Sequence, residues 1–106
     1  MLRYEDYKTR AVTLKFRKNC WIDGAFVPAV SGKTFASINP ATGKLLCQIA
    51  HGGAADIDCA VTAARTAFAD GRWSGKTPSE RKEVLLRLAA IIRENLTELA
   101  LLDTLD

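Results

Sequence analysis

The first half of the chain contains short apolar stretches separated by turn-forming residues, a pattern typical of short strands. Asp23-Gly24 lies between Trp21-Ile22 and Phe26-Val27, and this dipeptide adopts the positive φ angles of a tight hairpin turn. The next two apolar stretches, residues 34–38 and 45–50, are separated by a five-residue turn that contains a proline and a glycine. The pattern therefore predicts two antiparallel hairpins.

From residue 55 onward, apolar residues recur at helical spacing, which predicts amphipathic helices. The first of these helices covers about 55–69. The second begins at Thr77-Pro78-Ser79-Glu80, where the threonine hydroxyl and the glutamate carboxylate form a capping box. Asn95 is predicted to end this helix and to cap a third one. The apolar stripes are wider than two short hairpins could cover, so we expect part of their partner surface to be missing.

Basic residues are concentrated in residues 1–18, which form a charged N-terminal leader. In this leader Tyr4, Tyr7 and Ala11 have the spacing of a short helix. The remainder, residues 19–106, carries nearly balanced charge, which argues against a nucleic-acid partner or a membrane surface. A small basic nucleic-acid binder stays open as a hypothesis on the charge of the leader alone.

Composition excludes several kinds of site. The three cysteines have no C-x-x-C spacing, and the single histidine, His51, lies in a glycine-rich loop, so neither zinc nor a catalytic pair is indicated. Gly52-Gly53 follows a predicted strand but lacks the third glycine of a dinucleotide-binding loop. No apolar stretch approaches a membrane span and no secretion signal is evident, which favours a cytoplasmic protein.

Four blocks of sequence, in order, resemble the N-terminal segment of the NAD(P)-dependent aldehyde dehydrogenase superfamily. Each block is weakly specific, whereas the ordered set is strong. The leader and the third block look closest to bacterial γ-glutamyl-γ-aminobutyraldehyde dehydrogenases of putrescine breakdown. The blocks are Trp21–Val27, Ile38–Gly43, Asp56-Ile57-Asp58 with the alanine-rich stretch after it, and Glu80–Asp106.

The resemblance implies an α/β fold, namely the incomplete N-terminal part of a Rossmann-like cofactor domain with short β-hairpins followed by amphipathic helices. It also implies oxidation of a small aldehyde to an acid with NAD or NADP, by a homo-oligomeric enzyme. The family's cysteine nucleophile, its glutamate and its cofactor loop match no residue here. We therefore expect no catalytic and no cofactor-binding residue in this chain, and no activity from the chain alone.

The resemblance also implies part of a binding site for a monovalent cation. Members of the family bind structural sodium or potassium through backbone carbonyls and an aspartate that correspond to Ser37, Ile38 and Asp106. Oxygen ligands suit such a hard cation. The alternative is that Asp106 is an ordinary residue at a frayed helix end.

The last six residues continue an apolar helical pattern without a stop signal, which predicts that this sequence is cut from a longer one. The alternative to a fragment of an enzyme is a non-catalytic interaction module, or the remnant of a truncated gene, that docks on a full-length relative.

Overall fold

The computed structural model describes residues 2–106, which form two separate hairpins and a set of helices. Both sheets are antiparallel and two-stranded, in the order β1-β2 and β3-β4. The α/β class and the sequence of hairpins before amphipathic helices are therefore confirmed. The elements are α1 (Tyr4–Thr13), β1 (Cys20–Ile22), β2 (Ala25–Val27), β3 (Thr34–Ile38), β4 (Leu45–Ala50), α2 (Ala54–Ala69), α3 (Pro78–Glu94) and α4 (Leu96–Leu105).

The turn between β1 and β2 is the one that the sequence predicts. Asp23 and Gly24 have φ angles of +51° and +76°, so both lie in the left-handed region. This turn places Trp21 opposite Phe26, and the two rings meet edge to face with centroids 4.6 Å apart. The aromatic pair adds cross-strand stabilisation to a hairpin of only three residues per strand.

The second hairpin contains an irregularity close to its turn. Ser37 pairs with Cys47 and Ile38 pairs with Leu45, so Leu46 has no partner on β3. This arrangement is a β-bulge, which interrupts the ladder and bends the bulged strand. The bulge lies beside Ser37, one of the residues predicted for the cation site.

The capping box at the start of α3 is present as predicted. The Thr77 hydroxyl accepts a hydrogen bond from the Glu80 amide (3.3 Å), and the Glu80 carboxylate accepts one from the Thr77 amide (2.7 Å). The prediction for Asn95 is wrong in one respect, because its side chain makes no cap bond to α4. Its amide group instead donates to the carbonyl oxygen of Ile91 (2.8 Å), so Asn95 satisfies the end of α3.

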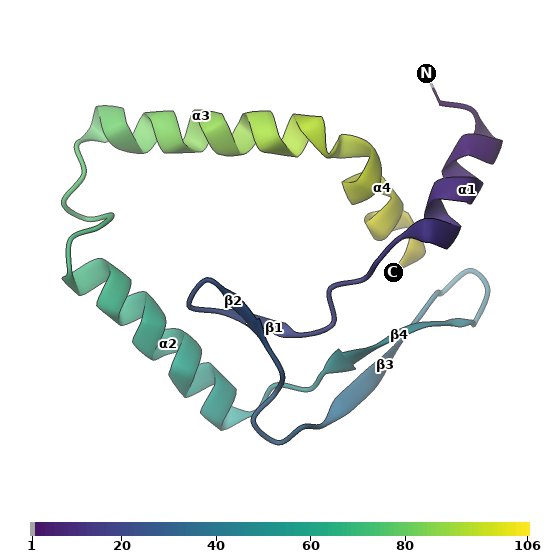
Figure 1. The fold of residues 1–106 in the computed structure, drawn as a ribbon, viewed down its shortest axis with the longest axis horizontal. Helices are drawn as coiled ribbons and strands as arrows, with labels where there is room; N and C mark the ends of the chain where they lie inside the picture. Colours follow the sequence, from purple (N-terminus) through teal and green to yellow (C-terminus); the bar gives the residue numbers. More distant parts are fainter. Residues whose placement is uncertain (1) are drawn as a thin grey trace.

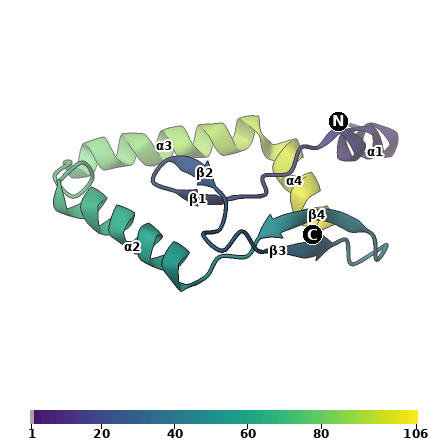
Figure 2. The ribbon, with the colours of Figure 1, turned by 60° about the horizontal axis from the view of Figure 1, so that its bottom comes forward.

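The elements lie in a thin, open arrangement in which α2, α3 and α4 surround the hairpins without covering them (Figure 1; Figure 2). The extents are 47 × 39 × 17 Å and the radius of gyration is 17.6 Å, against about 13 Å for a compact domain of this length. Buried apolar residues among the described residues are limited to Ala29, Cys47 and Leu101. The accessible surface is 8536 Å², about 2,700 Å² more than a compact protein of this mass exposes.

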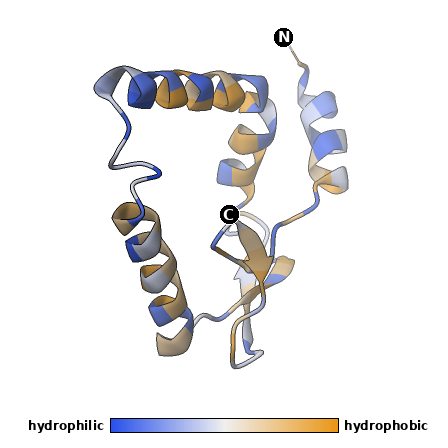
Figure 3. Ribbon diagram, turned by 60° about the vertical axis from the view of Figure 1, so that its left-hand side comes forward, coloured by the Kyte–Doolittle hydropathy of each residue, from blue (hydrophilic) through white to orange (hydrophobic). Residues whose placement is uncertain are grey.

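Much of the excess surface is apolar, as the sequence predicts. Hydrophobic residues follow one side of α3, while hydrophilic residues follow the other (Figure 3). Leu88, Ile91 and Ile92 on this helix remain 46–51% exposed. Val61 and Phe68 of α2 are likewise exposed, at 57% and 62%. No helix among residues 2–106 is both long enough and apolar enough to cross a membrane.

Candidate functional site

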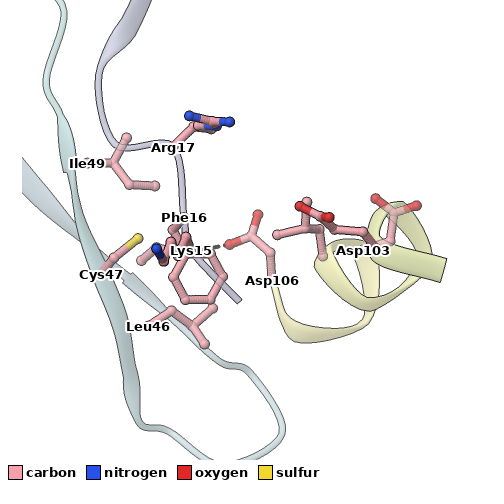
Figure 4. Close-up of a pocket in the computed structure, with 11 residues that line it drawn as sticks. Lys15, Phe16, Arg17, Leu46, Cys47, Ile49, Asp103 and Asp106 are labelled. Carbon is pink, nitrogen blue, oxygen red and sulfur yellow. Dashed lines mark hydrogen bonds between the residues drawn. The ribbon is translucent and has the colours of Figure 1, made fainter. Parts of the chain in front are cut away.

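A cavity of about 420 Å³ lies where the end of the leader, the second hairpin and α4 meet. Each of the three segments contributes part of the wall, and Figure 4 shows their side chains converging on it. The lining residues are Lys15, Phe16, Arg17, Ser37, Leu46, Cys47, Ile49, Glu98, Leu102, Asp103 and Asp106.

Ser37 and Asp106 meet at this cavity although 69 positions separate them in the sequence. The Ser37 hydroxyl donates a hydrogen bond of 2.7 Å to Oδ1 of Asp106. Ser37 is 8% exposed, so this bond satisfies a buried hydroxyl. The structure thus brings together two of the three residues predicted for a monovalent cation, and Ile38 follows Ser37 directly in β3.

The chemistry of this cluster suits a hard cation better than a transition metal. Its possible donors are a hydroxyl, a carboxylate and the backbone carbonyls beside the bulge, all of which are oxygen atoms. No group of three or more histidine, cysteine, aspartate or glutamate residues within 2–106 has the arrangement of a metal centre. The assignment of Ser37, Ile38 and Asp106 to a cation stays a prediction.

Basic residues of the leader face the same cavity. Lys15 and Arg17 line it together with Asp103 and Asp106 of the last helical turn (Figure 4). The Arg17 guanidinium also lies over the ring of Phe26, 5.2 Å from its centroid. The leader is therefore engaged with the rest of the chain at two places, which its charge alone did not indicate.

Asp56 occupies the N-terminal end of α2. Its carboxylate accepts hydrogen bonds from the amides of Gly53 (2.8 Å) and Val30 (2.9 Å), and the residue is 6% exposed. The bond from the Gly53 amide, together with the bond from Val30, holds the pKa of this carboxyl below its ordinary value. Asp56 thus joins the loop before β3 to the start of α2.

This arrangement decides what the Gly52-Gly53 loop can bind. A phosphate at a helix N-terminus needs free amides, and here the Asp56 carboxylate already takes the Gly53 amide. A second negative charge would also be repelled by this carboxylate. The residues of this loop therefore do not fit a dinucleotide cofactor.

The cavity has one thiol in its wall but not the imidazole. Cys20, Cys47 and Cys59 are free, and they are half-buried, buried and exposed, respectively. Cys47 lines the cavity, but His51 is not among the lining residues. The His51 ring instead meets Phe35 edge to face at 5.9 Å, and its side chain is exposed. Cys47 and His51 are thus not brought together at this cavity.

Sequence reasoning missed two features of the site. It explained Asp56 only by the helix dipole, whereas the carboxylate also fixes the distant Val30 amide. Glycine at position 53 followed three residues later by an aspartate is a capping pattern that could have indicated the local half of this contact. The contribution of Lys15 and Phe16 to the cavity has no local signal, because it depends on tertiary packing.

Comparison with known proteins gives a consistent result. The model of the aldehyde dehydrogenase family matches residues 26–106. Aminoacetaldehyde dehydrogenase of Pseudomonas aeruginosa is 51% identical over 106 residues, which are 100% of this chain and 21% of the relative. The crystal structure of γ-glutamyl-γ-aminobutyraldehyde dehydrogenase from Burkholderia cenocepacia J2315 is 45% identical, with a TM-score of 0.95 over 98% of this chain and 21% of its own.

A third match is the indole-3-acetaldehyde dehydrogenase of P. syringae, solved in complex with NAD+ and IAA. It is 42% identical, with a TM-score of 0.96 over 99% of this chain and 21% of its own. The chain therefore spans about a fifth of the length of these three relatives, and its fold closely matches that segment in the two solved structures. The leader lies outside the residues that the family model matches.

Proposed function

Because the chain belongs to the aldehyde dehydrogenase family, we propose that it is the N-terminal part of an enzyme that oxidises a small aldehyde to the carboxylic acid with reduction of NAD or NADP. The observation that carries the proposal is the match of nearly the whole chain, at TM-scores of 0.95 and 0.96, to one fifth of such enzymes. In this proposal residues 19–106 are part of the cofactor domain and residues 1–18 are a leader that precedes it.

The role of the chain in such an enzyme is structural. The loop most similar to a phosphate-binding loop is closed by the Asp56 carboxylate, and His51 is not part of the cavity that Cys47 lines. The groups that react with the aldehyde and hold the nicotinamide cofactor then belong to the other four-fifths of the enzyme. The exposed sides of α2 and α3 are the surfaces on which that remainder packs.

For the substrate we propose a nitrogen-bearing aldehyde, such as an intermediate of putrescine breakdown. Two of the matched relatives are named for aldehydes of this kind, aminoacetaldehyde and γ-glutamyl-γ-aminobutyraldehyde. The leader and the Asp56-Ile57-Asp58 block favour the second of these groups. A cytoplasmic, homo-oligomeric enzyme is part of the same proposal.

The cation site belongs to the proposal as well. Sodium or potassium would be held by Asp106 and by oxygen atoms of Ser37 and Ile38. The hydrogen bond between Ser37 and Asp106 supports this site, because it holds a carboxylate beside a break in the β-ladder. One Asp106 oxygen already accepts from Ser37, so the other is the one that faces the ion.

Complementation tests the enzyme proposal. The chain and the part of Pseudomonas aeruginosa aminoacetaldehyde dehydrogenase that follows the matched segment are produced separately, mixed, and assayed for NAD reduction with aminoacetaldehyde. We expect turnover from the mixture and none from either part. Turnover from the chain alone, or a mixture that neither associates nor turns over, would contradict the proposal.

The alternative of a non-catalytic module makes a different prediction in the same experiment. A module would bind the intact relative as well as the incomplete one. In the intact relative, however, the place of this chain is taken by the relative's own matching segment. We therefore expect the chain to bind the incomplete relative and not the intact one.

A further inference from the structure

The leader is not a free tail, because its residues line two grooves together with α4. The C-terminal end of α1 approaches α4 in Figure 1 and Figure 2, while Figure 3 shows the two helices apart. Tyr7, Ala11 and Leu14 have helical spacing and are all half-buried. Tyr7 and Ala11 line one groove shared with α4, and Leu14 lines a second.

Leu101 of α4 lies in the walls of both grooves. It is 8% exposed and is one of the few buried apolar residues that the structure describes. Leu99, two residues earlier and therefore on the opposite side of the helix, is 41% exposed. The burial of α4 is therefore concentrated on the side where the leader lies.

The leader continues from α4 to the second hairpin. Phe16 is half-buried in the wall of the cavity, between α4 and β4. Two residues later, the carbonyl oxygen of Lys18 accepts a hydrogen bond of 2.8 Å from the Ala50 amide at the end of β4. The leader thus contacts the same two units, α4 and the second hairpin, that the bond between Ser37 and Asp106 joins.

We propose that residues 4–18 are a conformational clamp that holds α4 against the second hairpin and keeps Asp106 beside Ser37. The clamp has two states, because α1 has only ten residues and no buried residue. An isolated helix of this length is marginally stable in water, so α1 forms when it docks and unfolds when it leaves. Undocking uncovers Leu101 and frees the last turn of α4, which carries Asp106.

The clamp does not depend on the dehydrogenase reaction. It lies outside the residues that the family model matches, although relatives that cover 98–100% of this chain share the segment. Failure of the complementation assay would leave the clamp unaffected, and failure of the clamp would leave the family function unaffected.

Hydrogen exchange of backbone amides in the 106-residue chain tests the clamp. The variant is Leu14→Ser, at a position that follows the last helical residue of α1 and so leaves its helix propensity unchanged. The matched control is Val12→Ser, since Val12 is 87% exposed on the same segment and serine and valine have similar helix propensity. A synthetic peptide of residues 1–18 gives the exchange rate of the undocked leader.

We expect α1 in the unmodified chain to exchange at least about tenfold more slowly than the peptide, as docking stabilises a helix that is marginal alone. Leu14→Ser should bring α1 to the rate of the peptide and speed exchange in α4, while Val12→Ser should change neither. Three outcomes would overturn the clamp: exchange of α1 at the peptide rate in the unmodified chain, no response of α4 to Leu14→Ser, or equal effects of the two variants.

Discussion

A carboxylate placed on the apolar side of α3 tests whether that side packs on the rest of an aldehyde dehydrogenase. Leu88 is 51% exposed in the chain, so Leu88→Asp removes little packing from the chain itself. In the complete enzyme the exposed half of the side chain would be buried, which is worth about 1 kcal/mol. An unpaired buried carboxylate adds at least about 2 kcal/mol more. Together these terms weaken association by about a hundredfold or more.

The assay is a titration of the incomplete Pseudomonas aeruginosa relative with the labelled chain, followed by the rate of NAD reduction at saturation. Ala90→Asp is the matched control, because it also changes a neutral residue of α3 to aspartate and lies on the opposite side by helical period. We expect a weakened complex for Leu88→Asp and an unchanged one for Ala90→Asp. Equal affinities would refute the assignment of the apolar side of α3 as a packing surface.

Three further predictions follow from single contacts. Asp56→Ala should speed hydrogen exchange at the start of α2, whereas Asp58→Ala, on an exposed side chain of the same turn, should not. Because the pKa of Asp56 is lowered on folding, the stabilisation of the fold by this carboxylate is complete above the ordinary aspartate pKa and is lost as pH falls through the folded pKa. If the protection of the α2 amides from exchange were constant with pH in this acid range, the assignment would be contradicted. Thr77→Ala should destabilise the helix in a peptide spanning α3 by about 1 kcal/mol, which circular dichroism measures as lower helicity. An unchanged spectrum would show that the capping box is not formed. Asp106→Ala should abolish the slowing of exchange that potassium produces in the last turn of α4 relative to tetramethylammonium at equal ionic strength, because it removes the carboxylate ligand, and a response that persists would place the ion elsewhere.

Local chemistry explains why most of the secondary structure could be predicted. Asp23-Gly24 fixes the first hairpin through positive φ angles that few other residue pairs accept, and the capping box at Thr77 fixes the start of α3. Both signals act within four residues. Asn95 shows the limit of this reasoning, since its side chain could satisfy either the helix before it or the helix after it. The sequence does not decide between the two, and the structure places the bond on the Ile91 carbonyl.

The site was less predictable because its contacts are distant in the sequence. Ser37 and Asp106 were paired only through resemblance to a family, and no pattern in this chain indicates that residues 69 positions apart form a hydrogen bond. The partnership of Asp56 with the Val30 amide, 26 positions away, is of the same kind. Such contacts depend on how the hairpins and helices are placed relative to one another, which hydrophobic periodicity does not specify.

The thinness of the fold limits the chemistry that residues 2–106 could perform by themselves. A layer 17 Å thick cannot shield a reacting group from water on both sides, and electrostatic stabilisation of a transition state requires such shielding. What a layer of this kind can supply is surface: about 2,700 Å² beyond that of a compact protein of equal mass, much of it apolar along α2 and α3. Interfaces of about this size are typical of permanent assemblies. This exposed apolar surface agrees with the proposal that the chain completes the fold of a larger enzyme, and the polar contacts of Asp56 and Ser37 join the segments that carry it.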